Sequence, residues 1–182
     1  MGQTADARVG SGPTVYDLRM NDGSRHFGSL PETYDTESPQ WHRLRAHLET
    51  LPGAALTRFV TDDVTEAWLE WTWREHAFSL NDQHGEWWFF VADPRCPDAL
   101  LEAVLTHFEV LLAPTTAFAR AAGPLARGQL RVVVLEPDGR VHHRDFEDAG
   151  AAQAYAADVR YEVEDDQGSP IAVVFDEGLT RL

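Results

Sequence analysis

The chain has 182 residues, of which 43% are hydrophobic and 25% charged, and 30 acidic residues against 15 arginines give it a formal net charge of −15. This length and composition are typical of a globular protein with one domain, or one domain and a smaller lobe. The negative charge argues against binding to nucleic-acid phosphates or anionic lipids, because both kinds of site need clustered cations. The same charge would attract a basic partner.

The features that bear on location favour the cytoplasm. Cys96 is the only cysteine, so an intrachain disulfide is excluded. Residues 1–12 lack the apolar segment of a secretory signal, and no run approaches the ~18 apolar residues of a membrane span. The strong bases are all arginine, a bias that GC-rich bacterial genes produce. We therefore expect a cytoplasmic bacterial protein with a flexible N-terminus at 1–12.

Residues 13–113 predict a tryptophan-rich lobe that contains most of the strands. Its first two strands flank Asn-Asp-Gly-Ser, a strong signal for a tight turn. Ser38 as N-cap and Pro39 mark the start of the first helix. In chain order, the expected elements are strands at 14–20 and 25–30, a helix at 39–51, strands at 55–61, 66–74, 76–81 and 86–92, and a helix at 97–112.

Residues 114–128, rich in alanine, proline and glycine, are expected to connect this lobe to a smaller one, with one short helix near 116–122. The smaller lobe, 129–182, predicts the order ββαββ and is expected to pack on the first. Its expected elements are strands at 129–136 and 141–146, a helix at 148–158, and strands at 159–164 and 171–176. A similar order occurs at 14–73, so a duplication and two independent hairpin arrangements are alternative interpretations.

The order of elements predicts the fold class. Runs of hairpins with few helices, and no regular alternation of strand and helix, argue against a doubly wound parallel sheet. We expect an α+β fold with a mainly antiparallel sheet of hairpins and a meander, and two or three helices packed on one face. Within this fold, a repeat of the ββαββ unit is one of the two alternatives given above.

The segment 64–91 holds five of the six tryptophans and is the main structural signal in the sequence. Alternation in strand 66–74 separates an apolar face from a mixed one. Strand 86–92 is apolar on both faces, which is typical of a central strand. We interpret the following large side chains as core: Leu69, Trp71, Trp73, Trp88 and Phe90.

The mixed face of strand 66–74 predicts a binding surface. Trp68 lies between Glu66 and Glu70 on that face, so the face contacts water. Rings bordered by carboxylates suit a cationic or amphipathic partner, because aromatic rings attract cations and dominate interface energetics. Trp87 fits either this surface or the core. The candidate binding surface comprises Glu66, Trp68, Glu70 and Trp87.

Two weaker signals concern chemistry, and we expect no catalytic residue, metal or cofactor from either. Asp82, His84 and Glu86 have an alternate spacing that suits a metal site, although a solvated turn explains them as well. Cys96 follows Arg95 and precedes a helix, and both features lower a thiol pKa. A small residue at the entry to a helix is the alternative interpretation. Phosphate-loop, hydrolase-elbow and dinucleotide-binding motifs are absent from the sequence.

These features predict a non-catalytic module that binds another protein. The simplest form of this partner is a basic protein, and we expect binding to neither nucleic acid nor membrane. An immunity or antitoxin-like protein is one form of this prediction. The alternative is an enzyme or a small-ligand-binding protein with an aromatic and acidic pocket on the sheet. A concave apolar pocket of at least ~300 Å³ with convergent polar groups would favour the alternative. A homodimer formed through the same face is a further option.

Overall fold

The computed structural model describes residues 13–31, 40–61, 67–83, 86–161 and 170–182. The protein has an α+β fold with a mainly antiparallel six-stranded sheet and a separate three-stranded sheet. The chain divides into two compact units, Met1–Phe108 and Glu109–Leu182, with one sheet in each.

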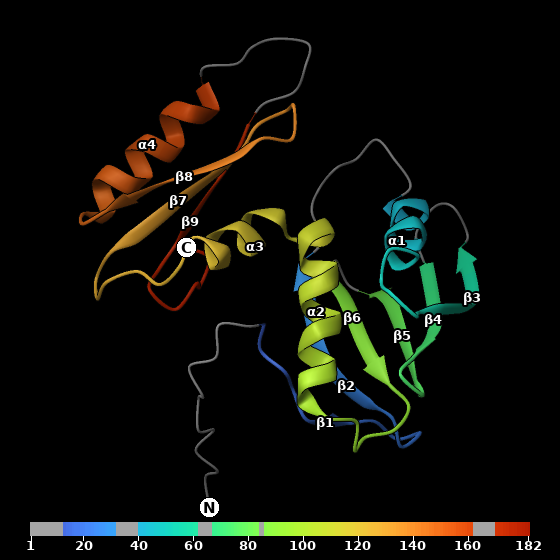
Figure 1. Ribbon diagram of the computed structural model, residues 1–182. Coiled ribbons are helices and arrows are strands. Elements are labelled where there is room, and N and C mark those ends of the chain that lie inside the picture. Colours follow the sequence, from blue (N-terminus) through green and yellow to red (C-terminus); the bar gives the residue numbers. More distant parts are fainter. Residues whose placement is uncertain (1–12, 32–39, 62–66, 84–85, 162–169) are drawn as a thin grey trace, which may run out of the picture. The chain divides into compact units, whose positions relative to one another are not determined.

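The first unit contains the six-stranded sheet, in the order β1-β2-β6-β5-β4-β3 (Figure 1). Its strands are β1 (Leu18–Arg19), β2 (Arg25–Pro31), β3 (Ala55–Thr61), β4 (Ala67–Trp73), β5 (His76–Gln83) and β6 (Glu86–Val91). Helix α1 (Gln40–Leu48) connects β2 to β3 at the far edge, and a meander then returns until β6 pairs with β2. Strand β6 is therefore internal, as its double-sided apolar pattern predicts.

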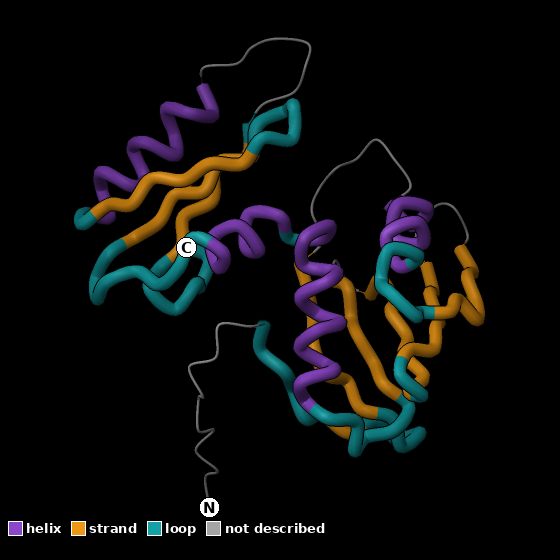
Figure 2. Tube along the Cα trace, viewed as in Figure 1, coloured by secondary structure: helices purple, strands orange, loops and turns teal. Residues whose placement is uncertain are grey.

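Helix α2 (Asp98–Leu112) covers one face of this sheet (Figure 2). The predicted core face of β4 is confirmed, because Leu69, Trp71 and Trp73 are all buried. The Trp71 ring stacks on Phe78 of β5 at 5.6 Å and contacts Phe108 of α2 at 5.5 Å between ring centroids. The core of the first unit thus consists largely of aromatic rings between α2 and the sheet.

A bulge in β2 fits that strand to α2. The pairing with β6 shifts between His26 and Gly28, and the Phe27 side chain is fully buried. A Cβ atom on Gly28 would lie 2.6 Å from both terminal methyl carbons of Leu105. Glycine therefore fits here without strain, whereas any side chain at position 28 would require Leu105 to move.

A reciprocal pair of histidines joins α1 to α2. The Nε2 atom of His47 lies 2.7 Å from the carbonyl oxygen of His107, and the Nε2 atom of His107 lies 3.0 Å from the carbonyl oxygen of His47. The two rings are stacked with centroids 4.2 Å apart. Burial lowers the pKa of His107, and the hydrogen bond to the carbonyl oxygen of His47 opposes this shift without reversing it. Each ring donates its Nε2–H to the carbonyl oxygen of the other residue, and the lowered pKa favours the neutral form of His107.

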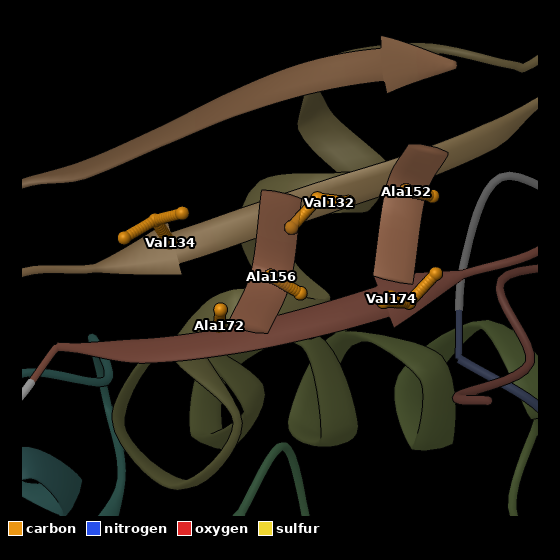
Figure 3. Close-up of a cluster of buried hydrophobic side chains, with 6 residues drawn as sticks. All are labelled: Val132, Val134, Ala152, Ala156, Ala172 and Val174. Atoms are coloured by element: carbon orange, nitrogen blue, oxygen red, sulfur yellow. The ribbon is translucent and has the colours of Figure 1, made fainter. Parts of the chain in front are cut away.

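The second unit is a three-stranded antiparallel sheet, in the order β8-β7-β9, with helices on both faces. Its elements are α3 (Pro114–Ala121), β7 (Leu130–Leu135), β8 (Val141–Phe146), α4 (Ala149–Tyr161) and β9 (Ile171–Phe175). One face packs its valines and alanines on α4, as Figure 3 shows for Val132, Val134, Ala172 and Val174 against Ala152 and Ala156. Val133 on the other face packs with Ala119 of α3.

Arg131 holds α3 and the two strands β7 and β8 together. Its guanidinium is buried and binds both carboxylate oxygens of Asp145 at 2.8 Å. It also donates to the carbonyl oxygens of Ala119 and Gly123, at 2.9 and 2.7 Å. Hydrogen bonding to Asp145 raises the pKa of Arg131, and the same bond lowers the pKa of Asp145. A buried charge is tolerated here because its donors are paired.

The prediction of a strand at 159–164 is wrong for its first residues, because α4 continues to Tyr161. Val159 belongs to the helical stripe that also contains Ala152, Tyr155 and Ala156, and this stripe packs on the sheet. The alternation that suggested a strand was therefore part of a helical period. The rest of the predicted strand lies outside the described residues, and the pseudo-repeat with it.

The described helices are short compared with a membrane span. No single one of them is long and apolar enough to cross a bilayer. Only α2 and α3, counted together as a bent pair, have the necessary length and composition.

Candidate functional site

A groove runs along β5 on the face of the six-stranded sheet that lies opposite α2. Its volume is about 600 Å³. Short side chains of β5 form the floor, and larger side chains of β4 and β6 form the walls. The floor residues are Ala77, Ser79 and Asn81, and the wall residues are Trp68, Glu70, Trp88 and Phe90. The turn between β1 and β2, with Asp22, borders the same space. We call this space the aromatic groove.

Strand register explains the hollow. Asn81 pairs with Trp68 on β4 and with Trp88 on β6, so these three side chains form one row across the sheet. The neighbouring row consists of Glu70, Ser79 and Phe90. In each row a short side chain lies between two longer ones, because alternate residues of a strand project from the same face.

Asn81 is the unusual polar group of the aromatic groove. The residue is only 3% exposed, and its side-chain oxygen Oδ1 has no hydrogen-bond partner within the described parts of the chain. A buried acceptor without a partner costs roughly 1–3 kcal/mol. Most buried polar atoms in folded proteins are paired, so an unpaired one in a groove indicates a position where a donor can be bound.

The charged side chains that line the aromatic groove, among the described residues, are acidic. Glu70 accepts a hydrogen bond from Arg58 of β3 at 3.3 Å, and its side chain is 36% exposed. Asp22 accepts hydrogen bonds from the backbone N–H and the hydroxyl of Ser24, at 2.9 and 2.7 Å. These bonds lower the pKa of Asp22, so its carboxylate is ionised at neutral pH.

An aromatic cluster supports the β6 wall from the side of β2. The ring of His26 stacks on Trp88 with centroids 5.1 Å apart, and it also contacts Phe90 and Tyr16. The Nε2 atom of His26 lies 3.0 Å from the carbonyl oxygen of Gly28. Burial lowers the pKa of His26. A neutral, hydrogen-bonded imidazole therefore fixes the position of Trp88 on the sheet.

The residues of the predicted binding surface differ in their exposure to solvent. Trp68 lies on the open face, where it is 38% exposed, and Glu70 lies beside it in the next row. Glu66 is outside the described residues. Trp87 is only 1% exposed and lies in the core, so its inclusion in the surface was wrong. Trp88 and Phe90, predicted to be core, instead line the groove and are partly exposed.

The assignment of Trp87 and Trp88 failed for a physical reason. Strand β6 is apolar on both faces, so its sequence does not show which side chains face the helix. Pairing decides the matter, because Trp87 lies opposite the buried Leu30 of β2 while Trp88 lies opposite Asn81 of β5. Asn81 is the last residue of the expected strand 76–81, whereas β5 continues to Gln83. The sequence signal that was missed is the short polar alternation of Ser79 and Asn81 within a strand.

The pKa of the Cys96 thiol is raised in the structure, although its neighbours in the sequence suggested a lowered value. The thiol is buried, and this burial, together with Asp93 and Asp98, raises its pKa to about 11. Arg25 acts in the opposite direction but does not reverse the shift. The Arg95 side chain points into solvent and pairs with Asp93 at 3.3 Å, so it does not stabilise a thiolate. Cys96 behaves as a small apolar residue at the entry to α2.

The set of residues that suggested a metal site lies partly outside the described residues. His84, the central residue of that predicted set, lies outside the described residues. Within the described segments, no group of three or more His, Cys, Asp or Glu side chains is arranged to hold a metal ion. What the aromatic groove offers is a different chemistry, namely ring surfaces for stacking, one buried hydrogen-bond acceptor and an acidic border. Comparisons with protein-family models, with curated proteins and with solved structures found no match.

Proposed function

We propose that this chain is a non-catalytic binding protein of the bacterial cytoplasm and that the aromatic groove receives a segment of a basic partner protein. The observation that supports the proposal is a concave surface of about 600 Å³ that carries Trp68 and Trp88 around an unpaired acceptor. Tryptophan is among the residues that contribute most to binding at interfaces. An immunity or antitoxin-like protein that blocks a basic toxin is one version of this role.

The charge of the chain supports a basic partner. A formal net charge of −15 produces a negative potential that accelerates the approach of cationic proteins. The groove itself adds Asp22 and Glu70 at its border. Because salt screens such long-range attraction, association should weaken as ionic strength rises.

A small organic ligand is the second candidate, and the size of the aromatic groove favours it. A volume of about 600 Å³ lies within the range of roughly 300–1,000 Å³ that small-molecule pockets occupy. The floor also supplies convergent polar groups from Ser79 and Asn81. This candidate shares the site with the first one and differs in the nature of the occupant.

A groove-filling substitution tests both candidates. Ser79→Tyr places a ring on the floor of the groove, and tyrosine is favourable in a strand, so the fold should be retained. Thr72→Tyr is the matched control, because Thr72 projects from the same face of β4 but does not line the groove. Each tagged protein is incubated with lysate of its native host at low and moderate salt, and captured proteins are identified by mass spectrometry.

The proposal predicts one basic protein that the wild type and Thr72→Tyr capture equally and that Ser79→Tyr captures at least tenfold less. Capture should decrease at the higher salt concentration. Equal capture by Ser79→Tyr, or no specific protein at low salt, would contradict the proposal. A small molecule that co-purifies with the wild type in native mass spectrometry, and not with Ser79→Tyr, would favour the second candidate.

A further inference from the structure

We infer that the aromatic groove recognises a guanidinium group, presented by an arginine side chain of the partner. Asn81 is the hydrogen-bond acceptor for this group, and Trp68 and Trp88 are its stacking surfaces. The inference rests on the proposed function, because it names the part of the partner that enters the groove. It follows from the acceptor, the spacing of the two rings and the charge of the border.

The acceptor at the floor requires a donor. The Oδ1 atom of Asn81 is a carbonyl oxygen, so only an N–H or O–H group can pair with it. The residue is 3% exposed and the oxygen has no partner in the described segments. A guanidinium supplies five N–H donors in one plane and has no acceptor of its own. It therefore satisfies Asn81 without burying a further unpaired acceptor.

The spacing of the rings suits one flat group. Strand β5 lies between β4 and β6, so the backbones of Trp68 and Trp88 are two strand spacings apart, about 9.5 Å. A flat group stacked between two upright rings needs about 7–8 Å, which is two van der Waals contacts. A guanidinium is planar and stacks on aromatic faces, whereas a lysine ammonium is compact and strongly hydrated.

The border of the groove favours a cation. Asp22 and Glu70 are the charged residues among its described lining, and both are acids. Glu70 already accepts a hydrogen bond from the guanidinium of Arg58 at 3.3 Å, in the row next to Asn81. This face of the sheet therefore accommodates an arginine side chain beside the proposed site.

Access to the Asn81 oxygen requires a neighbouring side chain to move. The Oδ1 atom is covered in the present side-chain arrangement. Trp68 is the flanking ring at the surface, with 38% of its area exposed, so rotation of its side chain opens the floor at low cost. Binding of a guanidinium is then accompanied by a change in the environment of the Trp68 indole, which can be measured.

The test uses three short peptides and the full-length chain. The peptides are acetyl-Gly-Gly-X-Gly-Gly-amide, where X is arginine, citrulline or lysine, and citrulline is the neutral analogue of arginine. Binding is followed by NMR through the indole N–H signals of Trp68 and Trp88. We expect the arginine peptide to shift both signals and to bind at least tenfold more tightly than citrulline and severalfold more tightly than lysine.

Variants of the acceptor provide the second part of the test. Asn81→Leu keeps the branched shape of the side chain but removes the acceptor, and it should lose at least tenfold in affinity for the arginine peptide, while Thr72→Val should retain it. Asn81→Asp replaces the acceptor by a carboxylate and should bind the arginine peptide severalfold more tightly. The gain in Asn81→Asp keeps the inference testable even where Asn81→Leu folds poorly.

Three results would overturn the inference: citrulline and arginine peptides of equal affinity, an unchanged affinity in both Asn81 variants, or shifts that do not include the two indoles. If Ser79→Tyr abolishes partner capture while the arginine peptide fails to bind, the proposed function stands and the guanidinium assignment is wrong. If partner capture is insensitive to Ser79→Tyr, the proposed function itself is wrong.

Discussion

The turn between β4 and β5 has a strained backbone that a single substitution should relax. Trp73 pairs with His76, so Arg74 and Glu75 are the two central residues of the hairpin turn, with φ angles of 46° and 68°. Both lie in the left-handed region, where a residue other than glycine costs roughly 1–2 kcal/mol and where Asn-Gly is preferred. The Arg74 guanidinium lies over the Trp73 ring at 4.9 Å, so Glu75 is the better position to change.

We expect Glu75→Gly to stabilise the first unit by about 0.5–1 kcal/mol. Relief of the strained φ contributes roughly 1–2 kcal/mol, and the larger conformational freedom of glycine in the unfolded chain offsets about 0.5–1 kcal/mol of it. The melting temperature should then rise by about 2–5 °C. Tryptophan fluorescence is the suitable measurement, because all six tryptophans lie in the first unit.

Gly53→Ala is the matched control for this prediction. Gly53 has a φ angle of 82°, and an added Cβ would meet no atom within 4 Å, so any loss reports the backbone conformation alone. We expect a destabilisation of about 1 kcal/mol. The reasoning would be refuted if Glu75→Gly lowered the melting temperature while Gly53→Ala left it unchanged. Glu75→Gly should leave arginine-peptide binding intact, because Glu75 does not line the groove.

Three further predictions concern other parts of the fold. Burial lowers the pKa values of His26 and His107 below the ordinary value of 6.5, so the unfolded chain binds protons at a higher pH than the folded chain does. We therefore expect the free energy of unfolding, measured with urea, to be constant above about pH 7 and to fall as the pH drops below 6.5. The fall should be smaller in His107→Gln. Gly28→Ala should lower the free energy of unfolding by about 1–3 kcal/mol, because its Cβ would lie 2.6 Å from Leu105 methyl carbons. The double variant Gly28→Ala, Leu105→Ala should lose less stability than the sum of the two single variants. Arg131→Met should destabilise the second unit by about 2–3 kcal/mol. This is less than the loss of a fully buried ion pair, because the Asp145 side chain is 35% exposed. Circular dichroism is the suitable measurement, since the second unit lacks tryptophan.

The secondary structure could be predicted from the sequence wherever the hydrophobic periodicity agreed with the residues that mark helix ends and turns. The strand at 141–146 coincides with β8, and the helix at 97–112 begins one residue before α2 and ends with it. Pro97 and the apolar stripe mark the helix, and Asp-Gly marks the turn before the strand. At 159–161, by contrast, three alternating residues fit both a strand and the end of a helix, and the contact of Val159 with the sheet decided the outcome.

The candidate site could be predicted only in part. Trp68 was identified because charged neighbours in β4 show which face contacts water. The identity of the opposite wall depends on the register between β5 and β6, which pairs Asn81 with Trp88 and which no local pattern specifies. The expected strand 76–81 contains the floor residues Ala77, Ser79 and Asn81, but its own pattern does not show which rings flank them. A binding surface formed by three adjacent strands is a property of their pairing.

The composition of the open face supports the proposal that a partner covers it. An antiparallel sheet with one face on its core normally presents polar residues on the other face. Here the row of Asn81 continues from Trp88 and Trp68 to Val60, which is 43% exposed, so apolar groups extend to the edge of the sheet. Contiguous exposed apolar groups, bordered by acids, mark interaction sites more often than chance. Under the proposed function, the buried acceptor at their centre is unpaired only while the partner is absent, and this would account for a row that combines two tryptophans with an unpaired amide oxygen.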